Sequence, residues 1–210
     1  MIRLPLPEPT LDGERCFLRP WEPQDASTLV AAWSDPEVRR WLPVPDHVDR
    51  SVAVDWIAGE ADRRRAGLAL DLVAVERVAG SGTGGPDADP EGRPGNGSTV
   101  PAQAGADVLG EVGLSAFDPE RGAARIGWWT VDGHRRRGVA TEMVGLLTTW
   151  ALGPQLGLTV LVAEVEPGNR GSVAVALAAG YVEVGRRDDG RLVLAAGSMT
   201  GAVSESGRRV

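Results

Sequence analysis

Short runs rich in valine and leucine alternate with segments of helical periodicity along most of the chain, and this alternation limits the possible fold. The runs have the length of strands, and several are apolar on both faces, which suits a mostly buried sheet. The strand candidates occupy residues 16–19, 68–78, 107–117, 125–131, 159–165, 181–185 and 191–195. Strands separated by helices are typical of an α/β protein, so the sequence predicts a mixed sheet with helices on both faces.

Capping residues and apolar spacing mark the helices between these strands. The helix candidates start after Asp25 and cover residues 36–42, 49–66, 138–152 and 170–179. The segment at 138–152 is the clearest, because its large apolar side chains recur on one helical face. Gly67 and Gly180 follow two of the segments and fit the position just beyond a helix end.

A stretch of glycine, proline and small polar residues interrupts the chain at residues 79–107. It has almost no apolar side chain larger than alanine, so it cannot bury enough surface to offset the entropy lost on ordering. Its flanks have the pattern of two strands of one sheet, which favours a disordered insertion over a linker between domains. We therefore predict one domain over residues 11–195, followed by a flexible tail at residues 196–210.

The charged residues exclude several classes of protein. All 22 basic residues are arginine, so neither a Schiff-base lysine nor the lysine of a Walker-type nucleotide site is available. The 29 acidic residues bring the net charge to -7, which argues weakly against nucleic acid as a partner. With one cysteine and two histidines in the chain, we expect no zinc site built from Cys and His, and no metal.

The sequence also bears on the compartment. Its first residues contain three prolines and no apolar core, unlike a signal peptide. No apolar run approaches the roughly 20 residues that a membrane helix needs. The single cysteine, Cys16, cannot form an internal disulfide. We expect a cytoplasmic protein with no membrane partner.

Residues 128–142 carry the most informative local pattern, a strand that runs through a basic turn into a helix. Backbone N–H groups at a helix N-terminus attract anions, helped by the helix dipole. Gly138 would let a phosphate approach the backbone, Ala140 keeps the first turn slim, and Thr141 can offer a hydroxyl. The arginines at 135–137 add positive charge. The pattern predicts a pyrophosphate site, with an ordinary exposed basic turn as the alternative.

The sequence at 135–140, Arg-Arg-Arg-Gly-Val-Ala, resembles the Arg/Gln-x-x-Gly-x-Gly/Ala loop of the GNAT acyl-CoA-dependent N-acyltransferases. Thr141-Glu142 is similar to the helix opening in the ribosomal-protein N-acetyltransferase (RimJ/RimL-like) branch of that family. Residues 167–172, with Gly180-Tyr181 after one helix, resemble the Pro-x-Asn-x-x-Ser and Gly-Phe/Tyr element of the same branch. Together these motifs are far more specific than the loop alone.

Two upstream segments add to the resemblance, which covers residues 11–194. Leu18-Arg19-Pro20 and the segment 33–38 with Trp41 are similar to the N-terminal pattern of the branch. The resemblance implies the GNAT fold, in which a mixed central sheet splays between two parallel strands with helices on both faces. It also implies that acetyl-CoA lies in the opening between those two strands.

The resemblance further implies which residues bind acetyl-CoA. The strand end at 129–131 would pair with the pantetheine arm, and its backbone N–H groups would polarise the thioester oxygen. The basic loop would hold the pyrophosphate, and Asn169 would bond the pantetheine arm unless it is only a helix cap. The implied cofactor-binding residues are Trp129, Thr130, Val131, Arg135, Arg136, Arg137, Gly138, Val139, Ala140, Thr141 and Asn169.

Proton transfer is the less defined part of the predicted site. The resemblance places Ser172 near the sulfur, where its hydroxyl could protonate the leaving thiolate; the alternative is a plain helix-face hydroxyl. Many relatives carry a glutamate where this sequence has Arg125. Glu111, Glu164 and Glu166 remain candidates for the general base, and each could instead be a surface carboxylate at a strand end. We take Ser172, Glu111 and Glu164 as the catalytic candidates.

These features predict an enzyme that moves an acetyl group from acetyl-CoA to a primary amine. The branch favours a protein N-terminal amine, which is also easier to deprotonate, with a reference pKa near 8 against about 10.4 for lysine. The alternatives are a small-molecule or antibiotic amine as acceptor, succinyl-CoA as donor, or a non-catalytic acyl-CoA-binding sensor. Trp33, Trp41 and Trp56 fall in the segment that lines the acceptor side in this family, as core or as part of the groove.

Overall fold

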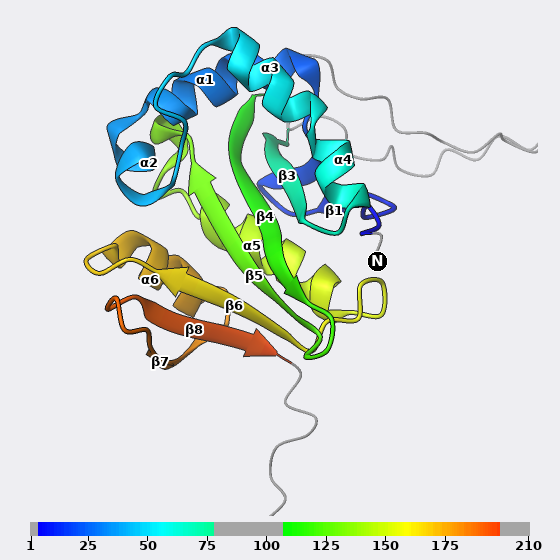
Figure 1. The fold of residues 1–210 in the computed structure, drawn as a ribbon, viewed down its shortest axis with the longest axis vertical. Helices are drawn as coiled ribbons and strands as arrows, with labels where there is room; N and C mark the ends of the chain where they lie inside the picture. The colour runs from blue at the N-terminus through cyan, green and yellow to red at the C-terminus, as the bar shows by residue number, and fades with distance from the viewer. Residues whose placement is uncertain (1–3, 78–106, 198–210) are drawn as a thin grey trace, which may run out of the picture.

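The computed structural model describes residues 4–77 and 107–197. Within these residues eight strands form one sheet in the order β1-β2-β3-β4-β5-β6-β8-β7 (Figure 1). The strands are β1 (Leu11–Asp12), β2 (Cys16–Pro20), β3 (Ala69–Glu76), β4 (Val108–Asp118), β5 (Ala123–Thr130), β6 (Val160–Val165), β7 (Val182–Arg186) and β8 (Leu192–Gly197). The helices are α1 (Ala26–Ser34), α2 (Pro36–Trp41), α3 (Arg50–Ala58), α4 (Glu60–Arg65), α5 (Val139–Leu152) and α6 (Arg170–Ala178).

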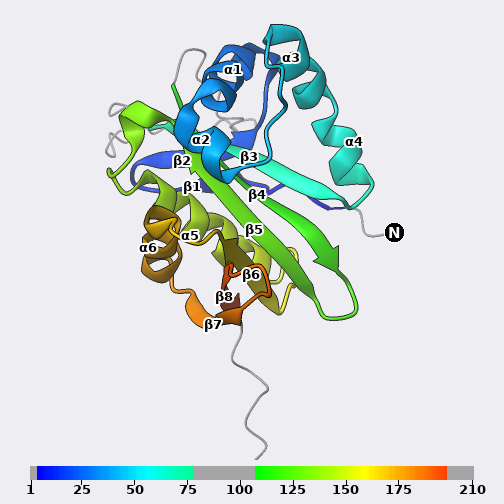
Figure 2. The same cartoon turned by 60° about the vertical axis from the view of Figure 1, so that its left-hand side comes forward.

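Two apolar clusters decide which helices cover each face of the sheet. Helices α5 and α6 lie on one face (Figure 2), where Met143 of α5 shares a buried cluster with Leu161 of β6. Helices α1 to α4 lie on the opposite face, where Trp33 of α1 and Ile57 of α3 share a second cluster with Val73 of β3. The predicted mixed α/β sheet with helices on both faces is therefore confirmed.

The sheet changes direction at the pair β5 and β6. These strands are parallel, whereas their neighbours on either side are antiparallel. Their pairing covers only Ala123↔Val160, Ala124↔Leu161 and Arg125↔Val162. Beyond Arg125, β5 continues to Thr130 on its own side of the sheet, still paired with β4. The two parallel strands thus part after a short contact, as the family resemblance implied.

The predicted helix at 49–66 is wrong in one detail, because the structure divides it into α3 and α4 at Gly59. The guanidinium group of Arg63 lies beside this glycine and donates a hydrogen bond of 2.9 Å to the carbonyl of Trp56. A Cβ atom at Gly59 would lie 3.1 Å from that guanidinium. The glycine leaves room for a side-chain bond that competes with the regular helix.

Other boundaries move by a few residues. The strand predicted at 107–117 extends to Asp118 through an irregular register near Ala116, which has a positive φ of 50°. The short strand β1 was not predicted, since two residues give no periodicity. Strand β8 continues through Gly197, two residues into the expected tail at 196–210, whose remainder lies outside the described residues.

The predicted insertion at 79–107 also lies outside the described residues, except for Asp107. Its flanks pair directly, since Val75 of β3 lies opposite Val108 of β4. In addition, the Glu76 amide donates to the Asp107 carbonyl at 2.9 Å. The chain therefore leaves and re-enters the sheet at neighbouring positions. Among the described residues, no helix has the length and apolar character to cross a membrane.

Candidate active site

A cavity of about 630 Å³ opens where β5 and β6 part. Strand β5 loses its neighbour on this side, so backbone groups along its edge can bond a ligand in the cavity. The walls come from five elements and one loop. The lining residues are 126–130 of β5, 163–166 at the end of β6, 169–172, Ala174 and Val175 at and in α6, Glu37, Val38, Trp41 and Leu42 in and after α2, Ala140 of α5, and Arg135 and Arg136 of the loop before α5.

The loop between β5 and α5 has the backbone shape of an anion site. Gly138 is the N-cap of α5 and has the left-handed backbone conformation, with φ of 82°. Among the described residues, no side chain caps the N-terminus of this helix. Arg136 also has a positive φ, 60°, which is uncommon for a residue other than glycine. Where left-handed residues lie next to residues with right-handed helical angles, successive backbone N–H groups can form a concavity that binds phosphate. The first N–H groups of α5 therefore remain available to an anion.

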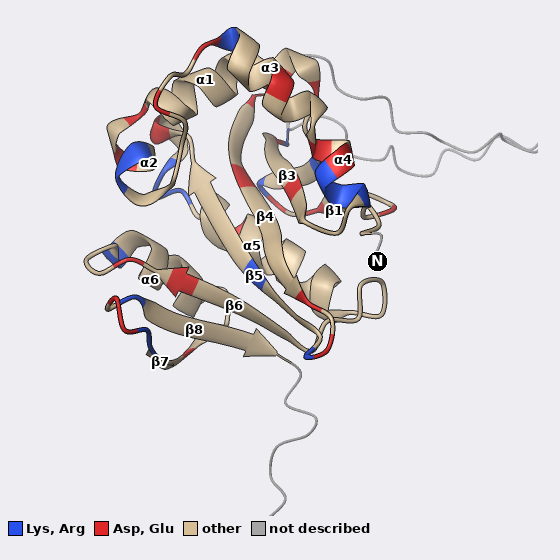
Figure 3. Cartoon of the chain, viewed as in Figure 1, with Lys and Arg blue, Asp and Glu red and all other residues tan. Residues whose placement is uncertain are grey.

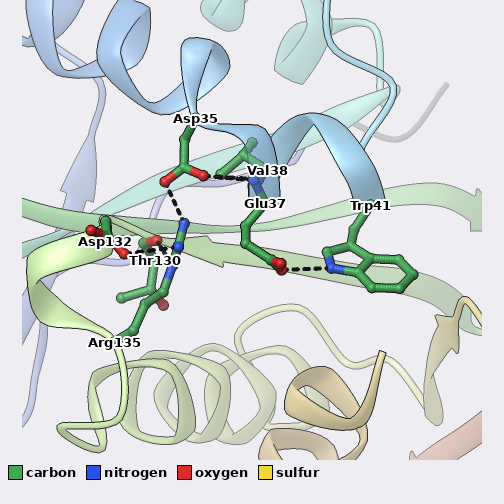
Figure 4. A network of polar contacts seen from close by, with 7 residues as sticks. All are labelled: Asp35, Glu37, Val38, Trp41, Thr130, Asp132 and Arg135. Carbon is green, nitrogen blue, oxygen red and sulfur yellow. Dashed lines mark hydrogen bonds and ion pairs between the residues drawn. The ribbon is translucent and has the colours of Figure 1, made fainter. Parts of the chain in front are cut away.

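The side chains of the loop residues differ in what they can contribute. Arg136 and Ala140 line the cavity, whereas Val139 is buried in the core. Arg137 is exposed and does not line the cavity. The Arg135 guanidinium donates to Asp35 at 2.6 Å, to Asp132 at 3.0 Å and to the Thr130 carbonyl at 3.1 Å (Figure 4).

Of the three residues at the end of β5 that are predicted to bind the pantetheine arm, two line the cavity and one does not. Trp129 and Thr130 line the cavity. Val131 does not, and its N–H donates to the Leu109 carbonyl of β4 at 2.9 Å. The Val131 N–H is therefore not available to a ligand in the cavity.

Asn169 and Ser172 meet at the start of α6 on the opposite wall. The Asn169 side-chain oxygen accepts from the Ser172 N–H at 3.0 Å, so this residue caps the helix. The amide NH₂ group of Asn169 stays free of that bond. Both residues line the cavity. The cap function and a contact to a bound ligand are thus compatible.

Two of the candidate carboxylates are engaged by arginines. Glu164 lines the cavity with 12 % of its side chain exposed, 3.1 Å from Arg187 Nε and 3.7 Å from Arg125. Figure 3 colours a basic stretch on β5 and an acidic stretch on the neighbouring β6. Glu166 bonds Arg191 at 2.8 Å. The residue that replaces the usual strand glutamate, Arg125, therefore forms an ion pair with the next strand.

Glu111 lies on β4, directly opposite Trp129 of β5 and outside the cavity lining. Its residue is half-buried, but its carboxyl group is surrounded by protein atoms, and this burial raises its pKa to about 8. The nearby Asp71 carboxylate raises the pKa further, whereas the indole N–H of Trp129, Arg63 and the indole N–H of Trp21 lower it. Trp21 Nε1 is buried and has no hydrogen-bond partner among the described residues. Glu111 thus sits behind the wall of the cavity as a carboxyl group that holds its proton near neutral pH.

The family model described as "Acetyltransferase (GNAT) domain" matches residues 15–182. The chain belongs to the GNAT acetyltransferase family. It is therefore an acyl-CoA-dependent N-acyltransferase, and acetyl-CoA is its acetyl donor.

Individual relatives agree with this assignment. An uncharacterized N-acetyltransferase, p20, from Bacillus licheniformis is 29% identical over 164 residues, which are 78% of this chain and 77% of the relative. A ribosomal-protein-S5-alanine acetyltransferase from Vibrio fischeri has a similar fold, with a TM-score of 0.68 at 16% identity, over 91% of this chain and 97% of that one. The microcin C7 self-immunity acetyltransferase MccE, solved with acetyl-CoA and AMP, gives 0.65 at 16% identity, over 89% and 94%.

The GNAT donor fits the residues of this acetyltransferase. The uncapped N-terminus of α5 and Arg136 suit a pyrophosphate, and the free edge of β5 suits the amides of a pantetheine arm. The described residues contain no group of three or more His, Cys, Asp or Glu placed to hold a metal ion.

Sequence reasoning missed Arg15, which approaches the same loop of the acetyltransferase from the turn between β1 and β2. Its Nε atom lies 3.4 Å from the position that a Cβ atom would take at Gly138. The Glu142 carboxylate of α5 holds this turn in place, because it accepts hydrogen bonds from the Glu14 and Arg15 amides. No pattern of neighbouring residues could predict the contact between Arg15 and Glu142, which lie 127 positions apart in the sequence.

Of the three predicted acceptor-side tryptophans, Trp41 alone lines the cavity. Its indole Nε1 donates to Glu37 at 2.9 Å (Figure 4). Trp33 and Trp56 instead stack edge to face, with ring centroids 5.5 Å apart. These two rings belong to the core beneath α1 and α3.

Proposed function

We propose that this acetyltransferase acetylates the N-terminal amine of a polypeptide. The observation that carries the proposal is the shape of the cavity, which continues from the donor loop, past the free edge of β5, to the wall formed by α2. On that wall Trp41 and Leu42 offer apolar surface, and the Glu37 carboxylate can attract an ammonium group. The fold shared with a ribosomal-protein acetyltransferase supports this acceptor class.

In the proposed reaction the loop residues 136–141 hold the pyrophosphate with their backbone N–H groups. The free edge of β5 at Thr130 aligns the pantetheine arm, and its N–H donates a hydrogen bond to the thioester oxygen, which gains negative charge as the amine attacks. The NH₂ group of Asn169 bonds the arm from the other wall. Ser172 protonates the thiolate as it leaves.

For the general base we favour Glu111 over Glu164. Both oxygens of Glu164 face arginines, so this carboxylate is committed to ion pairs. The raised pKa of Glu111, about 8, matches that of an N-terminal amine, and matched values favour proton transfer. Because Glu111 lies behind Trp129, the proton reaches it through a water molecule.

The acceptor class can be tested by measuring thiol release from acetyl-CoA with three sets of amines. The first is a set of short peptides with free N-termini; the second is the same peptides formylated at the N-terminus and carrying an internal lysine; the third is small polyamines and aminoglycosides. We expect turnover with the first set alone, and mass spectrometry should place the acetyl group on the α-amine.

Other outcomes would support a different acceptor, a different donor or a protein without enzymatic activity. Turnover with the second or third set would replace the polypeptide N-terminus by a lysine side chain or a small amine. Faster turnover with succinyl-CoA than with acetyl-CoA would change the donor. If coenzyme A binds but no amine in any set promotes thiol release, a binding protein without turnover becomes the better explanation.

A further inference from the structure

The Arg135 guanidinium joins two segments that lie far apart in the sequence. It bonds the Thr130 carbonyl and Asp132 at the end of β5, and on its other side it bonds Asp35, which precedes α2 (Figure 4). The Asp35 and Arg135 side chains are 17 % and 29 % exposed, so the pair is largely shielded from water. A shielded, charge-assisted bond of this kind is stronger than an ion pair at the surface.

Asp35 serves both segments at once. One carboxylate oxygen caps α2 by accepting from the Glu37 N–H at 2.7 Å and the Val38 N–H at 3.4 Å. The second oxygen accepts from Arg135 at 2.6 Å. Any shift of the Arg135 side chain is therefore passed directly to the first turn of α2.

The remaining polar contacts of α2 are local. Arg39 donates to the Trp33 and Pro45 carbonyls, and Trp41 donates to Glu37. Among the described residues, the bond between Asp35 and Arg135 is the one polar contact between α2 and the loop that leads into α5. Arg135 itself lines the cavity, and Asp35 directly precedes α2, whose residues form one of the cavity walls.

We propose that Arg135 is a positioning residue that sets α2, the acceptor wall, relative to the loop that holds the donor phosphates. Its planar guanidinium binds two carboxylates and a carbonyl in fixed directions, which a flexible ammonium group could not do. The Arg135 side chain then positions α2, while the backbone N–H groups of the loop bind the donor phosphates. The inference rests on the proposed function in one respect, namely that α2 faces the acceptor.

The test uses coenzyme A as the probe and needs no acceptor. Amide hydrogen exchange, followed by mass spectrometry, reports on α2 with and without coenzyme A, and calorimetry reports the affinity for coenzyme A. In the wild-type protein we expect coenzyme A to slow exchange in α2. In Arg135→Gln we expect exchange in α2 to be about tenfold faster, with or without coenzyme A, and the affinity to stay within about threefold of the wild-type value.

Asp35→Asn is a second variant that removes the charge while keeping a good N-cap residue, so α2 can still form. It should reproduce the Arg135→Gln result, and the double variant should add nothing further, because both changes remove the same contact. Arg121→Gln is the matched control: it breaks a bond of 2.6 Å to Asp118 at the opposite end of β5 and should leave α2 unchanged.

The outcomes separate this inference from the proposed function. Unchanged exchange in α2 of Asp35→Asn would overturn the positioning role, whatever the acceptor is. A loss of affinity for coenzyme A of more than tenfold in Arg135→Gln, with Asp35→Asn unaffected, would also overturn it and make Arg135 a phosphate ligand. A wild-type protein that binds no coenzyme A would instead refute the donor site, while the exchange rates of the free variants would still decide the role of Arg135.

Discussion

Glu111 is the general base that we propose, and its surroundings raise its pKa. Burial raises the pKa of its carboxyl group to about 8, and Asp71 adds to the effect. A base is active only when deprotonated, so kcat/KM of the wild-type enzyme should rise with pH and level off above about pH 8. Glu111→Gln should lower kcat/KM about 100-fold and leave only the rise that comes from deprotonation of the acceptor amine, as measured by thiol release across the pH range. Glu164→Gln is the control, and it should keep the pH dependence.

The same carboxyl group links stability to pH. Its pKa is higher in the folded protein than in the unfolded chain, so the folded state binds the extra proton at intermediate pH. The stabilisation is complete at low pH and is lost as the pH rises through about 8. Melting curves should therefore show the wild-type protein losing stability relative to Glu111→Gln between about pH 5 and about pH 9. Equal pH slopes for the two proteins would contradict the raised pKa.

Arg15 provides a second prediction for a single residue. Its guanidinium lies against Gly138, where the phosphates of the donor would bind. Arg15→Gln should weaken coenzyme A binding about fivefold in calorimetry, and the difference should shrink at high salt, because the side chain is half exposed. Arg121→Gln, an exposed arginine remote from the loop, should bind coenzyme A like the wild-type protein.

Among the elements, the start of α5 can be tested with two glycines of similar backbone conformation. Gly138 has φ of 82° at the start of α5, and Gly180 has φ of 89° after α6. Alanine at either position should cost about 1–2 kcal/mol, seen as a lower melting temperature. Only Gly138→Ala should also weaken coenzyme A binding, because Gly138 lies in the loop where the phosphates would approach the backbone, whereas Gly180 lies elsewhere. If both variants bind coenzyme A normally, the loop is not the phosphate site.

The sequence was informative about elements to the extent that their signals are local. The apolar stripe of α5 and the glycine after α6 lie within a few residues of the helices that they predict, and both helices are confirmed. The phosphate site at residues 135–140 stays a prediction. The division at Gly59 depends on one rotamer of Arg63, which periodicity cannot reveal. The contacts of Arg15 with α5 and of Arg135 with Asp35 join distant segments, so only the folded chain shows them.

On the scale of the whole molecule, the interruption between β3 and β4 can be tested. The strands pair up to Val75 and Val108, and the Glu76 amide bonds the Asp107 carbonyl. A short turn can join ends that are already neighbours, and loop-closure entropy changes slowly with length. Replacing residues 78–106 by a short glycine- and asparagine-containing turn should change the melting temperature by less than about 3 °C and leave coenzyme A binding intact. A larger drop would indicate that these residues contribute to the fold.

The brief pairing of β5 with β6 has a cost as well as a use. Sheets normally present unpaired backbone only at their outer strands, here β1 and β7, but this one has two additional edges in its interior. Such edges invite strands from other chains and so carry a risk of aggregation. The helices α2 and α6, which wall the cavity, limit that risk because an intruding strand would need room that they occupy. The opening that we propose for the slender thioester arm is thereby too confined for a strand that pairs along its full length.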